Sequence, residues 1–219
     1  MEVILNNIEV RVLGCMIEKE LSTPDYYPLS LNALTNACNQ KSNRDPLLSL
    51  EETDVVRAVD SLRFKQLVVI SSDGGRVPKY RHILSERMRL SPPELAVLGE
   101  LLLRGPQTLG ELRGRTERMH SFNDIAAVES VLEELMARTP PLLIRLSRQP
   151  GRKEPRYAHL FAGDPVQSDE DQISGPEVER ATVTAGNERL IQLEEQVASL
   201  KTEVAELRRI VEDLKAQFD

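Results

Sequence analysis

The chain has 219 residues, of which 40% are hydrophobic, and its formal net charge is −7 at pH 7. No apolar run approaches the roughly 20 residues that a membrane-spanning helix requires, and the N-terminal residues lack the pattern of a secretory leader. We therefore expect a soluble cytoplasmic protein that does not insert into a membrane.

The negative charge is unevenly distributed along the chain. Residues 1–84 carry 10 basic and 11 acidic side chains, residues 85–162 carry 12 and 10, and residues 163–219 carry 6 and 14. Because the first 162 residues are close to neutral, the acidic total does not argue against a nucleic-acid partner.

An internal repeat divides these first 162 residues. The sequence PKYRH at residues 78–82 recurs as PRYAH at residues 155–159, and VLG at residues 12–14 recurs at residues 97–99. Such a repeat predicts two small domains followed by a remainder. The predicted domains are residues 1–84 and residues 85–162.

The first domain is predicted to begin with three helices. Asn6 followed by Glu9 is the capping box that starts the first helix. A proline-containing loop over residues 22–28 separates it from a second helix, which starts at Leu29. A polar connector over residues 39–46 leads to a third helix. The apolar side chains that this third helix turns inward are Val55, Val59 and Leu62.

A hairpin closes the first domain. Residues 67–70 are rich in β-branched side chains, residues 71–76 contain the Asp-Gly signal of a tight turn, and residues 78–82 form the returning strand. We therefore expect a two-stranded hairpin after the third helix.

The second domain repeats this order. Ser91 and Glu94 form its capping box, and residues 142–146 and 155–159 are the predicted strands of its hairpin. Three helices closed by a two-stranded hairpin outline a winged helix-turn-helix, so we predict a mainly α, α+β protein with two such domains in tandem. The inward-facing residues of its third helix are Val128, Leu132 and Leu135.

The remainder of the chain contains a linker and a coiled coil. Residues 163–187 are rich in Gly, Pro, Ser and acidic side chains, which predicts a disordered acidic linker. Over residues 188–219 apolar residues alternate at spacings of three and four, which indicates a coiled-coil helix. Mostly β-branched residues at one heptad position and Leu at the other favour a parallel homodimer; the alternative is a helix that folds back onto its own chain. The candidate dimerisation residues are Leu190, Leu193, Val197, Leu200, Val204, Leu207, Val211, Leu214 and Phe218.

Two basic segments are candidate nucleic-acid contacts. The first is the second hairpin, whose tip over residues 147–153 suits contact with phosphates; the alternative is a solvated hairpin whose charges prevent edge-to-edge aggregation. The second is the connector of the first domain, whose amides and basic side chains suit contact with a nucleic-acid backbone or base edges. The alternative interpretation of this segment is an ordinary turn between helices. The hairpin candidates are Arg145, Arg148, Arg152, Lys153 and Arg156, and the connector candidates are Asn39, Gln40, Lys41, Asn43 and Arg44. The residues that extend the positive surface in the second domain are Arg113, Arg115, Arg118 and His120.

The third helices are acidic, which argues against insertion into the major groove. Residues 51–66 have a net charge of −1 and residues 123–138 a net charge of −3. A helix that enters the major groove passes between two rows of phosphates, so an acidic helix is repelled there. The acidic third helices therefore favour nucleic-acid binding by the second hairpin, or binding to a protein, over insertion of a helix into the major groove.

The sequence contains no catalytic constellation, so we expect a non-enzymatic protein without cofactor or metal. Cys15 and Cys38 show neither metal-ligand spacing nor a disulfide framework, and we expect them to be buried apolar residues. We predict a nucleic-acid-binding, transcription-regulatory protein whose partner is double-stranded DNA. The alternative is an adaptor that uses its winged-helix domains to bind a protein partner without binding DNA.

Two longer segments point to a family. The sequences TPDYYPLSLNAL at residues 23–34 and ACNQKSNRDP at residues 37–46 resemble the YceH family of bacterial proteins. The resemblance covers roughly residues 1–161, and it implies a tandem winged-helix fold in a cytoplasmic protein. It implies no catalytic or binding residues, because no function is assigned to the family.

Overall fold

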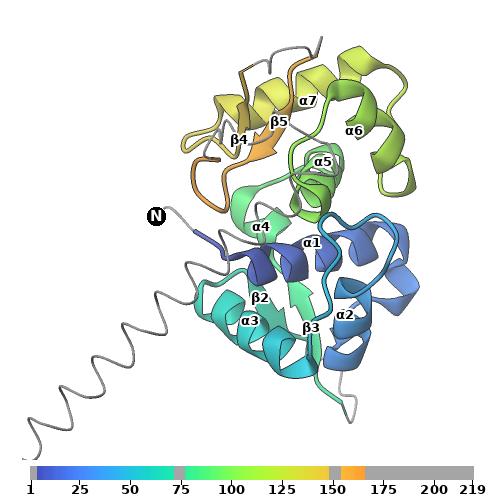
Figure 1. The fold of residues 1–219 in the computed structure, drawn as a ribbon, viewed down its shortest axis with the longest axis vertical. Helices are drawn as coiled ribbons and strands as arrows, with labels where there is room; N and C mark the ends of the chain where they lie inside the picture. The colour runs from blue at the N-terminus through green and yellow to red at the C-terminus, as the bar shows by residue number, and fades with distance from the viewer. Residues whose placement is uncertain (1–3, 72–76, 148–153, 166–219) are drawn as a thin grey trace, which may run out of the picture. The chain divides into compact units, whose positions relative to one another are not determined.

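Helices and short antiparallel strands alternate along the chain in the computed structural model shown in Figure 1. The structure describes residues 4–71, 77–147 and 154–165, which belong to one compact unit, Met1–Val166. The prediction of an α+β protein is confirmed. The predicted coiled coil and all its dimerisation residues lie outside the described residues, as do linker residues 166–187.

The first repeat, residues 1–84, places a three-stranded antiparallel sheet behind three helices. The strand order is β1-β3-β2, with Tyr80 of β3 opposite Leu29 of β1 and opposite Ile70 of β2. The elements of this repeat are α1 (Asn7–Ser22), η1 (Pro24–Tyr26), β1 (Leu29–Ser30), α2 (Leu31–Cys38), α3 (Glu52–Phe64), β2 (Val68–Ile70) and β3 (Lys79–His82).

Strand β1 corrects one predicted boundary. We expected the second helix to start at Leu29, but Leu29 pairs with Tyr80 instead, and α2 begins two residues later. The Ser30 hydroxyl accepts a hydrogen bond from the N–H of Ala33 at 3.3 Å and caps α2. Strand pairing thus ends at the residue that starts the helix.

The second repeat, residues 85–162, follows the same order. Gln107 forms an isolated antiparallel bridge with Tyr157, at the place in the repeat where β1 pairs with Tyr80. Strands β4 and β5 form a two-stranded antiparallel sheet. The elements are α4 (Leu84–Met88), which joins the repeats, α5 (Pro92–Arg104), α6 (Leu109–Arg115), η2 (Thr116–Arg118), α7 (Ile125–Ala137), β4 (Leu143–Arg145) and β5 (Tyr157–His159).

The predicted capping boxes and core residues are confirmed. The Asn6 side chain accepts hydrogen bonds from the N–H groups of Ile8 and Glu9, and the Glu9 carboxylate accepts the N–H of Asn6. Ser91 and Glu94 form the equivalent box at the start of α5. The inward-facing residues of α3 and α7 are no more than 1% exposed: Val55, Val59, Leu62, Val128, Leu132 and Leu135.

The capping glutamates have a second role that is repeated in both halves. The Glu9 carboxylate lies 2.6 Å from the Lys65 ammonium, and the Glu94 carboxylate lies 2.7 Å from the Arg138 guanidinium. Lys65 and Arg138 each occupy the C-cap position of the third helix of their repeat. In each repeat an ion pair therefore ties the start of the first helix to the end of the third.

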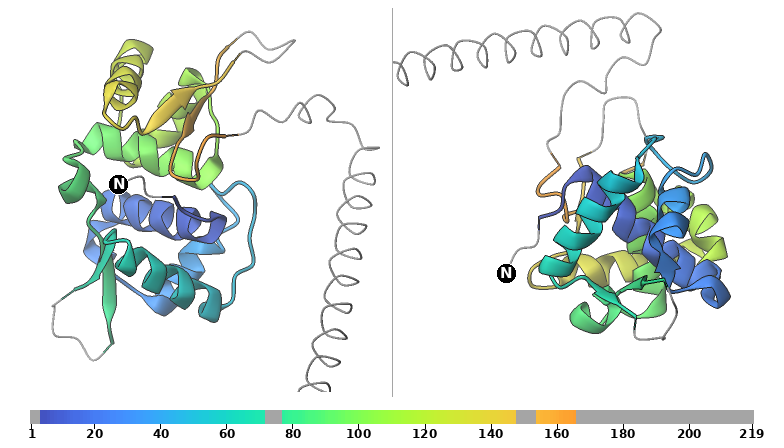
Figure 2. Two further views of the ribbon diagram at one scale, coloured as in Figure 1. Left: turned by 90° about the vertical axis from the view of Figure 1, so that its left-hand side faces the viewer. Right: turned by 90° about the horizontal axis from the view of Figure 1, so that it is seen from below.

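The repeats pack on each other where α1 crosses α5. A Cβ atom on Gly14 would lie 3.0 Å from Leu102, and one on Gly99 would lie 2.7 Å from Ile17. Gly99 lies 85 residues after Gly14, and Leu102 lies 85 residues after Ile17, so these residues are equivalent in the two repeats. Each glycine therefore faces the equivalent side chain of the other repeat, and the crossing is symmetric. Figure 2 shows the two helices in contact between the remaining helices of each half. The VLG motif thus marks the interface between the repeats.

Within the described ranges, no helix is both long and apolar enough to span a membrane.

Candidate functional site

The second hairpin exposes one of its predicted basic residues on a described strand. Arg145 of β4 pairs with Tyr157 of β5, and its side chain is exposed whereas that of Tyr157 is buried. Within the described residues, the Arg145 guanidinium has no hydrogen-bond or ion-pair partner. Arg148, Arg152 and Lys153 lie outside the described residues.

Arg156 fastens the hairpin to the body of the second repeat. Its Nη1 donates a hydrogen bond to the Pro106 carbonyl at 2.5 Å, and its Nη2 lies 3.4 Å from the Glu111 carboxylate. Burial alone would raise the pKa of Glu111, but the hydrogen bond from the Thr108 N–H and the charge of Arg156 outweigh it and lower that pKa. Arg156 is therefore held against the second repeat by Pro106 and by Glu111, a carboxylate that it shares with Arg115.

The same hairpin encloses His159. Burial lowers the pKa of its imidazole from 6.5 to about 4. The unfolded chain therefore binds this proton more readily than the folded protein does. The contribution of neutral His159 to the free energy of unfolding is fully present above pH 6.5 and is lost as the pH falls from 6.5 to about 4.

His159→Leu should remove this pH dependence. We expect the difference in the free energy of unfolding between the wild type and the variant to change by about 2 kcal/mol between pH 7 and pH 4.5. Urea denaturation of both proteins at the two pH values measures this change. A difference that is the same at both pH values would contradict it.

Most polar side chains of the first repeat's connector, one of the two predicted contact sites, are engaged in hydrogen bonds within the protein. Arg44 is 4% exposed, and its guanidinium binds the Glu18 carboxylate at 2.6 and 3.2 Å. The Asn39 side chain accepts the N–H of Leu50 and donates to its carbonyl, both at 2.8 Å. These polar side chains hold the loop closed by contacts within the first repeat.

Two further residues of the connector are also engaged. Gln40 accepts a hydrogen bond from Arg44 at 3.1 Å, and Asn43 donates one to the Glu100 carboxylate at 2.9 Å. Lys41 is exposed and has no partner within the described residues. Of the five connector candidates, Lys41 alone keeps a free charge at the surface.

A polar cluster, buried at Glu18, Arg44 and Glu100, joins the two repeats at this point. Glu18 of α1 accepts hydrogen bonds from Arg44 and, at 2.8 Å, from Arg118 of the second repeat. Burial alone would raise the pKa of Glu18, but the hydrogen bond and charge of Arg44 outweigh it and lower that pKa. Burial raises the pKa of Glu100, whose oxygen Oε1 has no hydrogen-bond partner. We call Glu18, Asn43, Arg44, Glu100 and Arg118 the junction cluster.

The sequence did not predict the junction cluster, because its members lie in both repeats. Glu18 and Arg44 are 26 residues apart, and Glu18 and Arg118 are 100 residues apart. Sequence spacing within one helix cannot indicate such contacts. The available signal was an acidic residue at position 100, within the otherwise apolar run from 95 to 103.

The arginines of the predicted extension of the positive surface make contacts within the protein. Arg115 donates to the Gln107 side chain at 2.7 Å and lies 3.4 Å from Glu111. Arg118 is bound to Glu18, and Arg113 donates to the carbonyl of Asn123 at 3.0 Å. His120 packs edge-on against Phe122.

Helix α7 presents an acidic face. Its exposed carboxylates, those of Glu129, Glu133 and Glu134, form no ion pair with any described residue. Arg138, the basic residue at the end of α7, is bound to Glu94 and to the carbonyls of Met88 and Arg89. Its charge therefore does not offset this acidic face.

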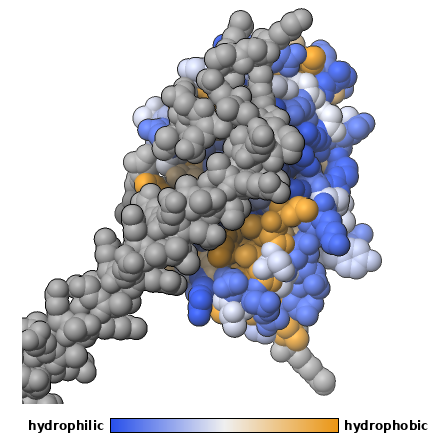
Figure 3. Space-filling view, in the orientation of Figure 1, coloured by the Kyte–Doolittle hydropathy of each residue, from blue (hydrophilic) through white to orange (hydrophobic). Residues whose placement is uncertain are grey.

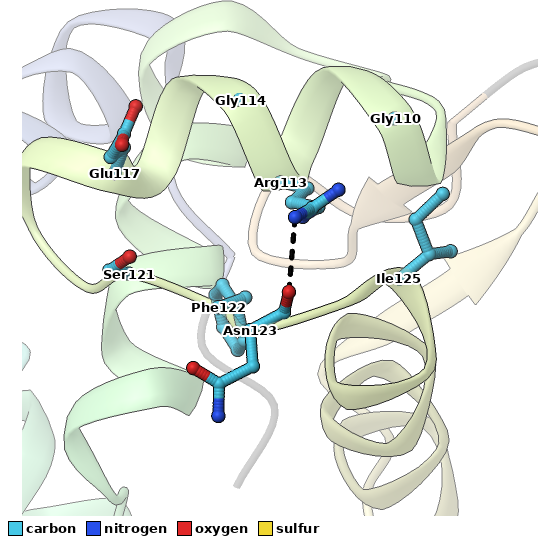
Figure 4. Close-up of a pocket in the computed structure, with 8 residues that line it drawn as sticks. All are labelled: Gly110, Arg113, Gly114, Glu117, Ser121, Phe122, Asn123 and Ile125. Atoms are coloured by element: carbon cyan, nitrogen blue, oxygen red, sulfur yellow. Dashed lines mark hydrogen bonds between the residues drawn. The ribbon is translucent and has the colours of Figure 1, made fainter.

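A pocket of about 510 Å³ lies between α6 and the segment that leads into α7. Figure 4 shows Arg113 reaching across it to the carbonyl of Asn123, with Phe122 beside them and Ile125 at the start of α7. Gly110 and Gly114 of α6 line the pocket, and a Cβ atom at either position would meet no atom within 4 Å. The pocket is thus open on the helix face that borders α7.

Exposed hydrophobic side chains form a separate feature. Figure 3 shows a hydrophobic area, coloured orange, on a face that is otherwise mainly hydrophilic. The three large hydrophobic side chains with the greatest exposure in the described ranges are Phe64, Tyr26 and Leu47, all from the first repeat.

The described residues contain no group of three or more His, Cys, Asp and Glu side chains that could hold a metal ion.

Comparison with known proteins identifies the family. Residues 5–152 match the family described as "Protein of unknown function, DUF480". The chain belongs to the DUF480 family. This finding confirms the membership in a bacterial family of unassigned function that the two sequence motifs indicated, and both motifs lie within the matched residues.

Relatives of the DUF480 chain extend over its whole length. It is 68% identical over 219 residues to UPF0502 proteins of Geotalea uraniireducens and of Geotalea daltonii. It is 64% identical over 219 residues to a UPF0502 protein of Geobacter sulfurreducens. Each alignment covers 100% of both chains, so these relatives share the C-terminal segment as well as the two repeats.

Proposed function

We propose that this DUF480 protein is a non-enzymatic, nucleic-acid-binding protein with two winged helix-turn-helix domains, in which the second hairpin makes the main contact. The observation that carries the proposal is the strand order. In the first repeat, β1 lies between the first two helices in the chain and pairs with β3, giving the order β1-β3-β2 behind three helices. This connectivity is typical of a winged helix, a fold that many DNA-binding proteins use.

The second repeat supports the same interpretation. Its bridge between Gln107 and Tyr157 takes the place of the pairing between β1 and β3. The β4–β5 hairpin then occupies the position of a wing. Two domains of this type, joined by the α1–α5 crossing, would hold two wings at a fixed separation.

Electrostatics favour the hairpin over α7 as the contact. Arg145 is exposed and unpaired within the described residues, and the adjoining tip adds Arg148, Arg152 and Lys153 by sequence. The unpaired carboxylates of α7 would be repelled by phosphates in a groove. DNA would therefore be bound through its backbone by the hairpin, which gives affinity with little sequence reading.

A salt series tests this proposal. Each phosphate neutralised in duplex DNA contributes about −0.9 to the slope of log K against log salt concentration. Four hairpin cations, with Arg156 excluded because it is paired to Glu111, contribute about −3.6. The variant Arg148→Ala/Arg152→Ala/Lys153→Ala should reduce this contribution to about −0.9. Fluorescence anisotropy of the full chain with a mixed-sequence duplex measures the slope.

A matched variant controls for net charge. Lys41→Ala/Arg57→Ala/Lys79→Ala removes three exposed cations of the first repeat that form no ion pair with a described residue, and its slope should stay close to that of the wild type. Equal effects of the two triple variants would show that the hairpin has no special part. Absence of binding at low salt by folded protein would overturn the nucleic-acid proposal.

The acidic face of α7 favours a second candidate, an adaptor that binds a protein partner. The unpaired carboxylates of Glu129 and Glu133 border the α6–α7 side of the repeat, where Ile125 is 47% exposed beside the pocket. A basic segment with an apolar anchor would complement this surface. A partner captured from bacterial lysate by the wild type and lost with Glu129→Lys/Glu133→Lys would support the adaptor.

We propose in addition that the protein is a homodimer. The support is the heptad pattern over residues 188–219, which predicts a helix with Leu and β-branched residues along one face. A dimer would bring four winged-helix domains, and two basic hairpins, to one nucleic acid. This would raise affinity through multivalency without additional contacts.

A further inference from the structure

The pocket between α6 and the start of α7 has the size of a small-molecule site. Its volume of about 510 Å³ lies within the range of roughly 300–1,000 Å³ that is usual for such sites. The two glycines of α6 that line it, Gly110 and Gly114, have no side chain to fill it. The pocket therefore leaves room for a ligand directly against the backbone of α6.

Arg113 is the one cation among the described residues that line the pocket. Its Nη2 donates to the Asn123 carbonyl at 3.0 Å, and this bond holds the guanidinium across the pocket, as Figure 4 shows. No carboxylate of a described residue forms an ion pair with it. A guanidinium is planar and binds a carboxylate through parallel N–H groups. The remaining N–H groups of Arg113 are therefore free to bind an anion.

The nearby carboxylates do not compete for this position. Glu117 lies at the η2 end of the pocket, and Figure 4 shows its side chain directed away from Asn123. Asp124 accepts a hydrogen bond from the N–H of Ala127 at 2.8 Å and caps α7. The charged group that a ligand meets beside Asn123 is therefore the guanidinium of Arg113.

Apolar side chains form the rest of the contact surface. The Phe122 ring is 7% exposed and is held edge-on by His120, with 4.7 Å between the ring centroids. Ile125, at the start of α7, is 47% exposed, so a ligand that covers it removes apolar surface from water. A flat apolar group would contact both side chains and the glycine face of α6.

We propose that this pocket binds a small organic carboxylate with a planar apolar body. The carboxylate binds Arg113, and the apolar body lies against Gly110 and Gly114 on one side and against Phe122 and Ile125 on the other. A neutral apolar compound would lack the first contact, and a small hydrophilic anion would lack the second. The pocket therefore favours an aromatic acid over either.

Helix α6 connects the pocket to the second hairpin. Glu111 of α6 lies 3.4 Å from Arg156, which also donates to the Pro106 carbonyl. A ligand that packs on Gly110 and Gly114 contacts the helix that holds the hairpin through Glu111. Occupancy of the pocket should therefore alter nucleic-acid binding by the hairpin, a consequence that rests on the function proposed above.

A fluorescence titration of the full chain with 2-naphthoate tests the site. The chain contains no Trp, so the emission of the naphthalene ring is measured without a tryptophan background. We expect a saturable change with a Kd of about 1 mM or lower. The neutral compound 2-naphthamide has nearly the same shape and should bind about tenfold more weakly. The absence of a saturable change, or equal binding of the two compounds, would overturn the proposal.

Three variants locate the binding site. Arg113→Gln should weaken 2-naphthoate binding about tenfold and leave 2-naphthamide binding unchanged. Gly114→Leu should abolish the binding of both compounds, because its side chain fills the pocket, in a chain whose circular dichroism matches the wild type. Arg145→Gln removes the exposed, unpaired arginine of the hairpin and should bind 2-naphthoate as the wild type does. A loss with Arg145→Gln equal to that with Arg113→Gln would place the anion on the hairpin and contradict the pocket assignment.

Addition of duplex DNA separates this proposal from the proposed function. In the wild type, 2-naphthoate should change the Kd for a mixed-sequence duplex, whereas in Gly114→Leu it should have no effect. A chain that binds 2-naphthoate but no DNA would contradict the nucleic-acid function and support the site. A chain that binds DNA but no 2-naphthoate would have the opposite meaning.

Discussion

Arg44→Met should lower the free energy of unfolding by about 3–5 kcal/mol, the cost of breaking a buried ion pair by removing one partner. The Arg44 and Glu18 side chains are 0% and 1% exposed. The substitution leaves the Glu18 carboxylate with Arg118, whose side chain is 58% exposed, and with the Lys19 ammonium at 3.6 Å. Urea denaturation of the wild type and the variant measures the change. This is the largest loss of stability that we expect from a single substitution in the junction cluster.

Two further variants make the result specific. Lys41→Met alters the same loop at an exposed, unpaired position and should change stability by less than about 0.5 kcal/mol. Arg44→Met/Glu18→Met removes both buried charges and should recover much of the lost stability. If Glu18→Met lowers the free energy of unfolding as much in the Arg44→Met protein as it does in the wild type, the two residues are not coupled and the account of the junction fails.

Gly99→Leu should destabilise the protein by about 3 kcal/mol, because the α1–α5 crossing has no room for a side chain. A Cβ at this position would already lie 2.7 Å from Cγ2 of Ile17, a branched side chain that cannot rotate away easily. Gly99→Ala should produce a smaller loss, of about 1 kcal/mol. Thermal or urea denaturation gives both values.

A helical glycine elsewhere provides the opposite sign. Gly114 lies in α6, where a Cβ would meet no atom within 4 Å. Gly114→Ala should therefore stabilise the protein by up to about 0.5–1 kcal/mol through helix propensity. A loss of stability at Gly114 equal to that at Gly99 would mean that the helix crossing is not what constrains Gly99.

Features decided by neighbours in sequence were predicted well. The capping boxes at Asn6 and Ser91 depend on residues three positions apart, and both are confirmed. The hairpin strands and the inward faces of α3 and α7 follow from short periodic patterns, and these are also confirmed. Strand β1 was missed because two residues carry no periodicity, and Leu29 becomes a strand residue only by pairing with Tyr80.

Features decided across the two repeats were not predicted. A connector rich in amides and basic residues has the same composition whether it contacts nucleic acid or closes on itself. Its role depends on Glu18 and Glu100, which lie in helices of different repeats. The repeated VLG motif was visible in the sequence, but its glycines become meaningful only when α1 and α5 are seen to cross.

Hydrogen–deuterium exchange of the full chain, with and without mixed-sequence duplex DNA, tests the central claim most directly. If the second hairpin leads nucleic-acid binding, peptides covering residues 143–159 should gain protection at low salt, and those covering the exposed face of α7 should not change. Protection concentrated on α7, or no protection anywhere while the protein remains folded, would contradict the account.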